Sequence, residues 1–201
     1  DMNRDLTLPI AEVRASSKGT QKEERWPAVR TMASLPEMRK AQIAVALVKI
    51  LGRIQRQDSP LWGYRTGEIA YAMARAHHAY YQALESRGEA RILTNREDFE
   101  AHMQLWSDAE SCDELPVGMV IGMEGADPIL WPEHVQEWWE IGVRTLNLAH
   151  YGTSTYSHGT GRPGGLLPAA KPLLRELEGL GVILDLTHTA EQAFWEALDL
   201  F

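Results

Sequence analysis

The chain alternates between compact apolar runs and longer segments in which apolar residues recur every three or four positions. The run from Val117 to Met123 is almost uninterrupted, which is typical of a parallel strand covered on both faces. The run from Gln42 to Leu51 is similarly apolar and favours a buried strand over a surface helix, although periodicity alone does not decide between them. The pattern predicts strands at residues 42–51, 117–123, 144–149 and 182–186.

The segments between these runs have helical periodicity. From Thr66 to Arg87 apolar residues recur at three- and four-residue steps, and Gly88 favours an end of the helix there. Asn95 is a suitable N-cap for a shorter helix with two acidic residues in its first turn. The pattern predicts helices at residues 66–87, 95–106, 132–141, 169–180 and 190–201.

Strand and helix alternate three times in the second half of the chain. This order predicts right-handed βαβ units, a parallel sheet and therefore the α/β class. A length of 201 residues is enough for one domain with a sizeable core, so we expect residues 1–201 to form a single domain. Residues 15–40 are polar and contain prolines, which indicates a loop excursion from that domain.

Charge and cysteine content narrow the function classes. The net charge of −8 disfavours binding to nucleic acid or to anionic membrane surfaces. No apolar run reaches the roughly 18 residues of a membrane span. Cys112 is the single cysteine and cannot form an intramolecular disulfide. With no signal-peptide pattern at the start either, we expect a cytoplasmic protein.

The candidate chemistry stands where the late strands end. Glu124 follows the strand at 117–123, His150 follows the strand at 144–149, and His188 follows the strand at 182–186. The carboxyl ends of parallel strands meet on one face, where loops build active sites. One carboxylate and two imidazoles directed at one point are typical of zinc sites. The sequence therefore predicts that these three side chains converge on a metal.

Each residue also has a purely structural interpretation. Glu124 can be a strand-end carboxylate paired with an arginine, and His150 can be a hydrogen-bonded core histidine. His188 follows Asp185 and Thr187 closely enough to be bonded locally. All three structural interpretations have to hold together for the metal site to be absent.

Four segments resemble, in order and spacing, the membrane dipeptidase family of zinc peptidases. The resemblance implies a TIM-type (β/α) barrel in which Glu124 bridges two zinc ions and His188 binds one of them. It implies that His150 contacts the substrate and helps to hold the tetrahedral intermediate, with Tyr151 beside it as a substrate-binding residue. The matching segments are Gly118–Gly125, Gly142–His150, Gly165–Pro168 and Leu180–His188.

The chain departs from the family pattern at its beginning. The family's first metal motif is His-x-Asp, and this chain has Asn3-Arg4-Asp5, with asparagine in place of histidine. We therefore expect the His-x-Asp pair before Asp1. The family's remaining zinc histidine, substrate arginine and proton-accepting aspartate are expected after Phe201. On this interpretation the chain carries the N-terminal portion of the barrel and part of the active site.

The function implied by the resemblance is zinc-dependent hydrolysis of small peptides, most of all dipeptides. Two alternatives stay open: an inactive barrel that serves as a binding or assembly subunit, and a related amidohydrolase acting on a non-peptide amide or a lactone. The expected partner is a small peptide substrate. Seven tryptophans in the chain are enough to allow a homo-oligomer contact without establishing one.

Overall fold

The computed structural model describes residues 5–16, 32–57 and 62–201, and these divide into two compact units. The first unit contains the described residues up to Ala46 together with Tyr81–Met119. The second contains the described residues of Leu47–Tyr80 together with Val120–Phe201. The expectation that residues 1–201 form one domain stays a prediction. The Asn3-Arg4 part of the Asn-Arg-Asp stretch lies outside the described residues.

The first unit holds short helices and a short strand. The strand β2 pairs in parallel with the first residues of β3, from Ala90 opposite Val117 to Ile92 opposite Met119. Its elements are α1 (Ile10–Ser16), α2 (Leu35–Lys40), β2 (Ala90–Ile92) and α4 (Arg96–Asp108), and the first residues of β3 (Val117–Glu124) complete it.

The loop expected at residues 15–40 is helical at both of its ends. Ser16 is the last residue of α1, and α2 begins at Leu35 with Pro36 in its first turn, where the missing N–H of proline costs nothing. The Glu37 carboxylate accepts hydrogen bonds from the Ser34 hydroxyl and from the Ile10 N–H at 3.2 Å, and these bonds hold the start of α2. Residues 17–31 of the expected loop lie outside the described residues.

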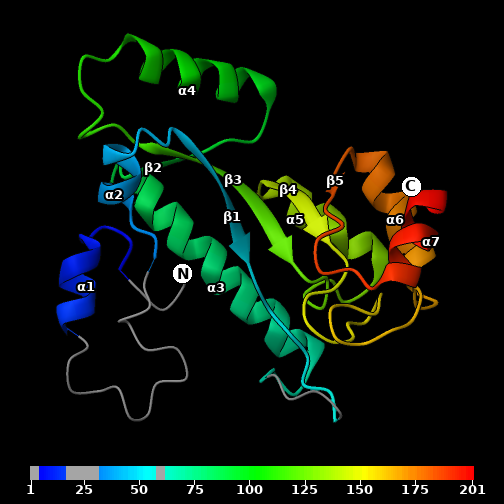
Figure 1. Cartoon of the computed structure of the whole chain (residues 1–201). Helices are drawn as coiled ribbons and strands as arrows, with labels where there is room; N and C mark the ends of the chain where they lie inside the picture. The colour runs from blue at the N-terminus through cyan, green and yellow to red at the C-terminus, as the bar shows by residue number, and fades with distance from the viewer. Residues whose placement is uncertain (1–4, 17–31, 58–61) are drawn as a thin grey trace. The chain divides into compact units, whose positions relative to one another are not determined.

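The second unit contains most of a sheet and the helices around it (Figure 1). The strand order is β1-β3-β4-β5, and β3, β4 and β5 are parallel to one another. The strands are β1 (Val45–Ile50), β3, β4 (Val143–Asn147) and β5 (Ile183–Leu184). The helices are α3 (Gly67–Ser86) as far as Tyr80, the 3-10 turn at Pro132–His134, α5 (Val135–Glu140), α6 (Ala170–Leu180) and α7 (Glu191–Leu200).

Burial explains why the apolar runs became strands. Six of the eight residues of β3 are buried, as expected for a strand covered on both faces. Trp138 of α5, Leu146 of β4 and Leu173 of α6 are fully buried. The α/β class and the parallel sheet predicted from the sequence are confirmed. None of the described helices is long and apolar enough to cross a membrane.

Two strands differ from expectation. The strand predicted at 182–186 is reduced to Ile183–Leu184, because the Asp185 side chain accepts bonds from the N–H and hydroxyl of Thr187 and turns the chain out of the ladder. The three-residue strand β2 was missed, because so short a segment has no readable alternation.

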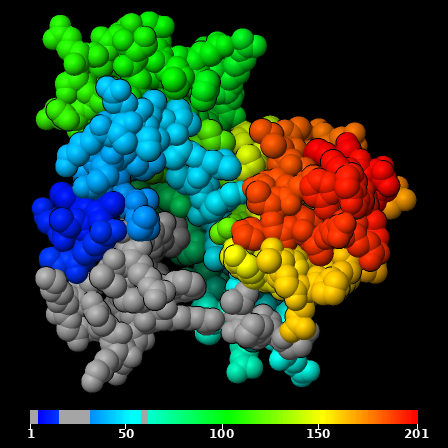
Figure 2. Space-filling view, viewed as in Figure 1, coloured from blue at the N-terminus to red at the C-terminus, as the bar shows by residue number. Residues whose placement is uncertain are grey.

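The parallel strands place their carboxyl ends on one face of the second unit. Glu124 is the last residue of β3, and the chain after β4 and after β5 continues into loops on the same side. Figure 2 shows the loop after β4, in yellow and amber, packed against the orange and red residues that follow it. This loop approaches the end of the sheet closely, since a Cβ on Gly159 would lie 2.1 Å from the His150 carbonyl oxygen.

Candidate metal centre

Glu124, His150 and His188 come together at the carboxyl ends of the parallel strands. Each offers one ligand atom, and these atoms all lie within 4.8 Å of one another. The three side chains are half-buried and are therefore not part of the packed core. Glu124 and His150 also line a small recess. The convergence expected from their strand-end positions is therefore present in the structure. Their roles as metal ligands or catalytic groups stay predictions.

The carboxylate of Glu124 lies beside both imidazoles, whose ring centroids are 4.4 Å apart. Its Oε1 lies 3.4 Å from Nε2 of His150 and 3.8 Å from Nε2 of His188. Both distances exceed the roughly 2.9 Å of an ordinary hydrogen bond to an N–H. The structural alternative, in which Glu124 pairs with an arginine, finds no such pair among the ion pairs of the described residues. The space between the three side chains is thus bounded by one oxygen and two nitrogen atoms.

Arg53 contacts the ring nitrogen of His150 that does not face Glu124. The Arg53 guanidinium lies in hydrogen-bond contact with Nδ1 of His150. A guanidinium can only donate, so Nδ1 accepts, and a neutral ring then carries its proton on Nε2. Burial, with the nearby Arg53 and His188, lowers the pKa of His150 to about 4, which keeps the ring neutral near pH 7. The Nε2–H group therefore faces the centre as a donor.

His188 occupies an unusual backbone position. Its φ of 63° lies in the left-handed region, which residues other than glycine seldom adopt. Its carbonyl oxygen accepts a hydrogen bond from the Thr160 N–H at 2.7 Å, and its Nδ1 lies 3.3 Å from the Thr160 hydroxyl. The local alternative, in which Asp185 binds the ring, is not what the structure shows, because Asp185 bonds Lys49 and Thr187. With Nδ1 beside a hydroxyl, Nε2 is left facing Glu124.

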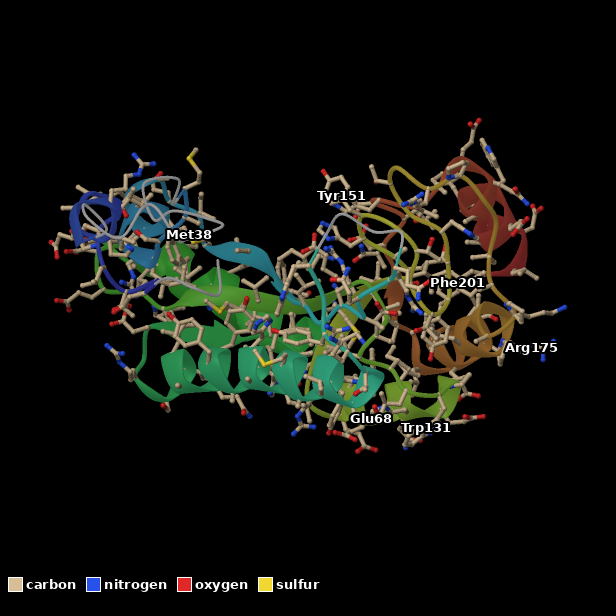
Figure 3. All side chains as sticks on the ribbon, turned by 90° about the horizontal axis from the view of Figure 1, so that it is seen from below. Met38, Glu68, Trp131, Tyr151, Arg175 and Phe201 are labelled. Carbon is tan, nitrogen blue, oxygen red and sulfur yellow. The ribbon has the colours of Figure 1, made fainter. Side chains whose placement is uncertain are left out.

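Tyr151 forms the outer wall of the recess. Its ring lies 4.7 Å from the ring of His150 and 4.9 Å from that of His188, measured between centroids. The side chain is 46% exposed, so one face of the ring is open to solvent. Figure 3 labels Tyr151 among the loop segments at this end of the unit. The substrate-binding role expected of Tyr151 stays a prediction.

Two residues of the site were missed by sequence reasoning. Arg53 lies three residues after β1, so the strand-end rule applied to the later strands would have marked it. Thr160 belongs to the loop after β4, and no sequence pattern connects it with His188. The recess is lined by Arg53, Glu124 and His150 together with Gly125, Asp127 and Tyr151.

A larger hollow of about 540 Å³ lies in the first compact unit, and none of these residues lines it. Its lining includes Arg39 and Cys112. Arg39 already donates to the carbonyl oxygens of Leu115 and Glu89 and pairs with the Glu89 carboxylate. Among the described residues, the group able to hold a metal is at the strand ends and not in this hollow.

Comparison with known proteins identifies the family of this chain. The family model of membrane dipeptidases, peptidase family M19, matches residues 7–200. The chain belongs to the membrane dipeptidase family. An uncharacterized dipeptidase of Schizosaccharomyces pombe is 32% identical over 89 residues, which are 42% of this chain and 22% of that protein.

Solved structures show the same fold as this family member. A family M19 metallopeptidase, dipeptidase AC, superposes with a TM-score of 0.67 at 20% identity, covering 96% of this chain and 58% of its own. A metallopeptidase from Rhodobacter sphaeroides superposes with a TM-score of 0.67 at 18% identity, covering 96% of this chain and 60% of its own. The α/β fold predicted from the sequence is thus the TIM-type barrel fold of M19 dipeptidases. The chain spans about three fifths of the length of these two structures.

Proposed function

We propose that the complete protein is a zinc-dependent dipeptidase whose centre is partly built by this chain. One observation carries the proposal: Glu124, His150 and His188 present ligand atoms within 4.8 Å of one another in a member of the membrane dipeptidase family. The donor set fits zinc, which takes imidazole nitrogen and carboxylate oxygen ligands. The proposal includes two zinc ions, with further ligands supplied by the rest of the protein.

Glu124 and His188 are the metal-holding residues of this chain in the proposal. A carboxylate with two oxygens can bridge two ions, and Oε1 of Glu124 lies within 4 Å of Nε2 of both imidazoles. His188 would bind through Nε2 while its Nδ1–H is held by the Thr160 hydroxyl, the arrangement that fixes the ring of a metal-bound histidine. Bound zinc polarises a peptide carbonyl and makes water acidic enough to supply a nucleophile near neutral pH.

His150 is assigned to the substrate and not to the metal. A metal ligand needs a free lone pair, but the lone pair on Nδ1 faces the Arg53 guanidinium and Nε2 carries the proton. That Nε2–H can donate to the carbonyl oxygen of the scissile peptide bond. The donated hydrogen bond strengthens as negative charge develops on this oxygen in the transition state. The neutral state of the ring near pH 7 supports the same role.

The proposed substrate class is supported by a relative. The Rhodobacter sphaeroides metallopeptidase was solved with a phosphinate mimic of the dipeptide L-Ala-D-Ala. A phosphinate has the tetrahedral shape of a peptide bond under attack, so a mimic of this kind resembles a dipeptide during hydrolysis. We extend this substrate class to the present protein, with Tyr151 as the wall against which a small side chain packs. The cytoplasmic location and a homo-oligomeric state stay predictions.

The test uses the complete protein. We expect purified enzyme to contain zinc and to hydrolyse dipeptides with free termini, to lose activity on removal of metal by a chelator, and to regain it with Zn²⁺. A protein that holds no metal and cleaves nothing would favour the binding or assembly subunit. A metal-loaded protein that cleaves lactones or non-peptide amides but no dipeptide would favour the related amidohydrolase.

A further inference from the structure

A largely buried ion pair connects β1 with the residue that follows β5. Nζ of Lys49, in β1, lies 2.7 Å from Oδ2 of Asp185, the residue that follows β5. The side chains are 22% and 17% exposed, so the pair is largely removed from water. The pKa of Asp185 is lowered: burial raises it, but hydrogen bonds from Lys49 and Thr187 outweigh the burial. The pair is therefore charged in the folded chain.

The strands between β1 and β5 are adapted to this pair. Gly122 of β3 has no side chain where Lys49 passes, and a Cβ there would lie 3.1 Å from both Cδ and Nζ of Lys49. The same Cβ would lie 2.3 Å from the Thr145 hydroxyl oxygen, so β3 admits nothing larger than glycine at this point. Asn147 of β4 is fully buried, and its Oδ1 lies 3.4 Å from Nζ of Lys49.

The partners of Lys49 lead directly to the two histidines. Asp185 accepts hydrogen bonds from the N–H and the hydroxyl of Thr187, at 2.9 and 2.7 Å, and Thr187 precedes His188. Asn147 donates through Nδ2 to the carbonyl oxygen of Ala149 at 3.0 Å, and Ala149 precedes His150. The same amide lies 3.5 Å from the carbonyl oxygen of Thr187. The residues before His150 and His188 are thus hydrogen-bonded to Asn147 and Asp185, the two partners of Lys49.

The backbone of His188 needs such support. A φ of 63° is unfavourable for a residue with a Cβ and persists only where surrounding contacts hold it. The hydrogen bond from the Thr160 N–H holds the carbonyl oxygen of His188. The hydrogen bond that Asp185 accepts from the Thr187 N–H holds the residue before His188. A loss of either set would let the ring leave its direction toward Glu124.

We propose that Lys49 and Asp185, with Asn147, are positioning residues that set the direction of His188, and through Ala149 that of His150, toward the metal centre. This inference rests on the proposed function, because it assigns the pair to the geometry of a zinc site. A buried ion pair adds little net stability against an apolar replacement, since desolvation offsets the attraction. We assign this pair a positioning role because its partners bond the residues before His150 and His188.

The test compares variants of the complete enzyme. Lys49→Met removes the charge, Asp185→Asn keeps the shape of the acceptor but not its charge, and the double variant removes both charges. Lys171→Met, at an exposed position of α6, is the matched control. The measurements are zinc affinity by competition with a chelator, the visible absorption of the Co²⁺-substituted enzyme, kcat and KM for a dipeptide, and thermal unfolding of the metal-free protein.

We expect Lys49→Met to weaken zinc binding by about 10–100-fold, the usual effect of losing a group that orients a metal ligand. Its Co²⁺ absorption should change, and kcat should fall more than KM rises. The double variant should bind zinc no worse than Lys49→Met, because the two charges act as one unit. Lys171→Met should match the wild type in every measurement.

Three outcomes would overturn the inference. One is a Lys49→Met enzyme with wild-type zinc affinity and Co²⁺ absorption. Another is a variant whose metal-free form only melts at a lower temperature while its metal site is unchanged, since the pair then acts only on stability. The third is a double variant in which the two losses of zinc affinity simply add. Failure of the proposed function is distinct, because it shows in the wild type as absence of bound zinc or of dipeptide hydrolysis.

Discussion

Glu124 and Glu137 are both carboxylates beside histidines in the same compact unit, but their surroundings differ. Glu137 accepts hydrogen bonds from the Tyr71 hydroxyl at 2.6 Å and from Nε2 of His134 at 3.0 Å, and it also pairs with Arg75. The hydrogen bond from Tyr71, more than the nearby charges, lowers the pKa of Glu137. Among the ion-pairing groups of the described residues, Glu124 has the imidazoles of His150 and His188 near its Oε1, at 3.4 and 3.8 Å.

The difference separates a structural cluster from a binding site. The donors around Glu137 engage both of its oxygens, so the cluster holds together without a ligand and links α3 to α5. The atoms around Glu124 face a common point at distances too long for good hydrogen bonds among themselves. In the proposed function a cation would be held by Glu124 and His188, while the Nε2–H of His150 would donate to the substrate. A histidine beside a carboxylate is therefore informative only when its other partners are known.

The largest expected effect comes from neutralising the two carboxylates in parallel. In the complete enzyme, Glu124→Gln should lose bound zinc and about 10³-fold in kcat, because several kcal/mol of charge stabilisation depend on the metals. Glu137→Gln should keep zinc and activity and lose about 1 kcal/mol of stability, a value reduced by its partial exposure. Metal analysis, kinetics and denaturant unfolding of both variants give the comparison. Equal zinc loss in the two variants would remove the distinction between the clusters.

The two histidines of the centre should differ from each other. His150→Ala should keep its zinc and lose about 10²–10³-fold in kcat, the usual effect of removing one oxyanion donor. His188→Ala should release zinc and lose activity together, because it removes a ligand. Zinc content and steady-state kinetics of the two variants decide the matter. Zinc loss in His150→Ala with retention in His188→Ala would reverse the two roles.

A smaller effect is expected from Arg53, which contacts Nδ1 of His150. Arg53→Met should lower kcat by about 10–100-fold with zinc retained, because the ring loses the donor that holds its proton on Nε2. Nitrogen-15 NMR of the histidine rings should show the loss of the single Nε2–H form in the variant. An unchanged tautomer with unchanged kcat would show that Arg53 does not orient this ring.

The smallest effect concerns a histidine outside both clusters. His102 is fully buried in the first unit and donates through Nε2 to the Ala44 carbonyl oxygen at 2.9 Å. Burial lowers its pKa, and the hydrogen bond to Ala44 only partly opposes this. Below about pH 6.5 His102 therefore takes up a proton in the unfolded chain but not in the folded chain. The free energy of unfolding then decreases as the pH is lowered.

His102→Gln keeps an N–H donor but cannot titrate. Denaturant unfolding at pH 7 and pH 5 should show a larger loss of stability in the wild type than in this variant. The same loss in both proteins would mean that His102 does not contribute to the acid sensitivity. Replacing His102 should thus change the stability of the fold, whereas replacing His150 or His188 should change kcat or zinc content.

Most elements were predictable because their signals are local. The helix expected at 66–87 is found at Gly67–Ser86, and the predicted cap Asn95 accepts a hydrogen bond from the Asp98 N–H. The apolar run at 117–123 is the strand β3. The convergence of Glu124, His150 and His188 was also predictable, since parallel strands bring their carboxyl ends to one face.

The sequence by itself determined the class of fold, the strand-end residues and, through its resemblance, the family. Only the tertiary structure showed that Arg53 faces Nδ1 of His150 and that Lys49 reaches Asp185 across Gly122. These pairs are separated by 97 and 136 positions in the chain. Periodicity and capping reflect neighbours within one or two turns, so they carry no signal for such contacts. The protonated nitrogen of a histidine and the direction of a ligand are set by partners that folding alone brings near.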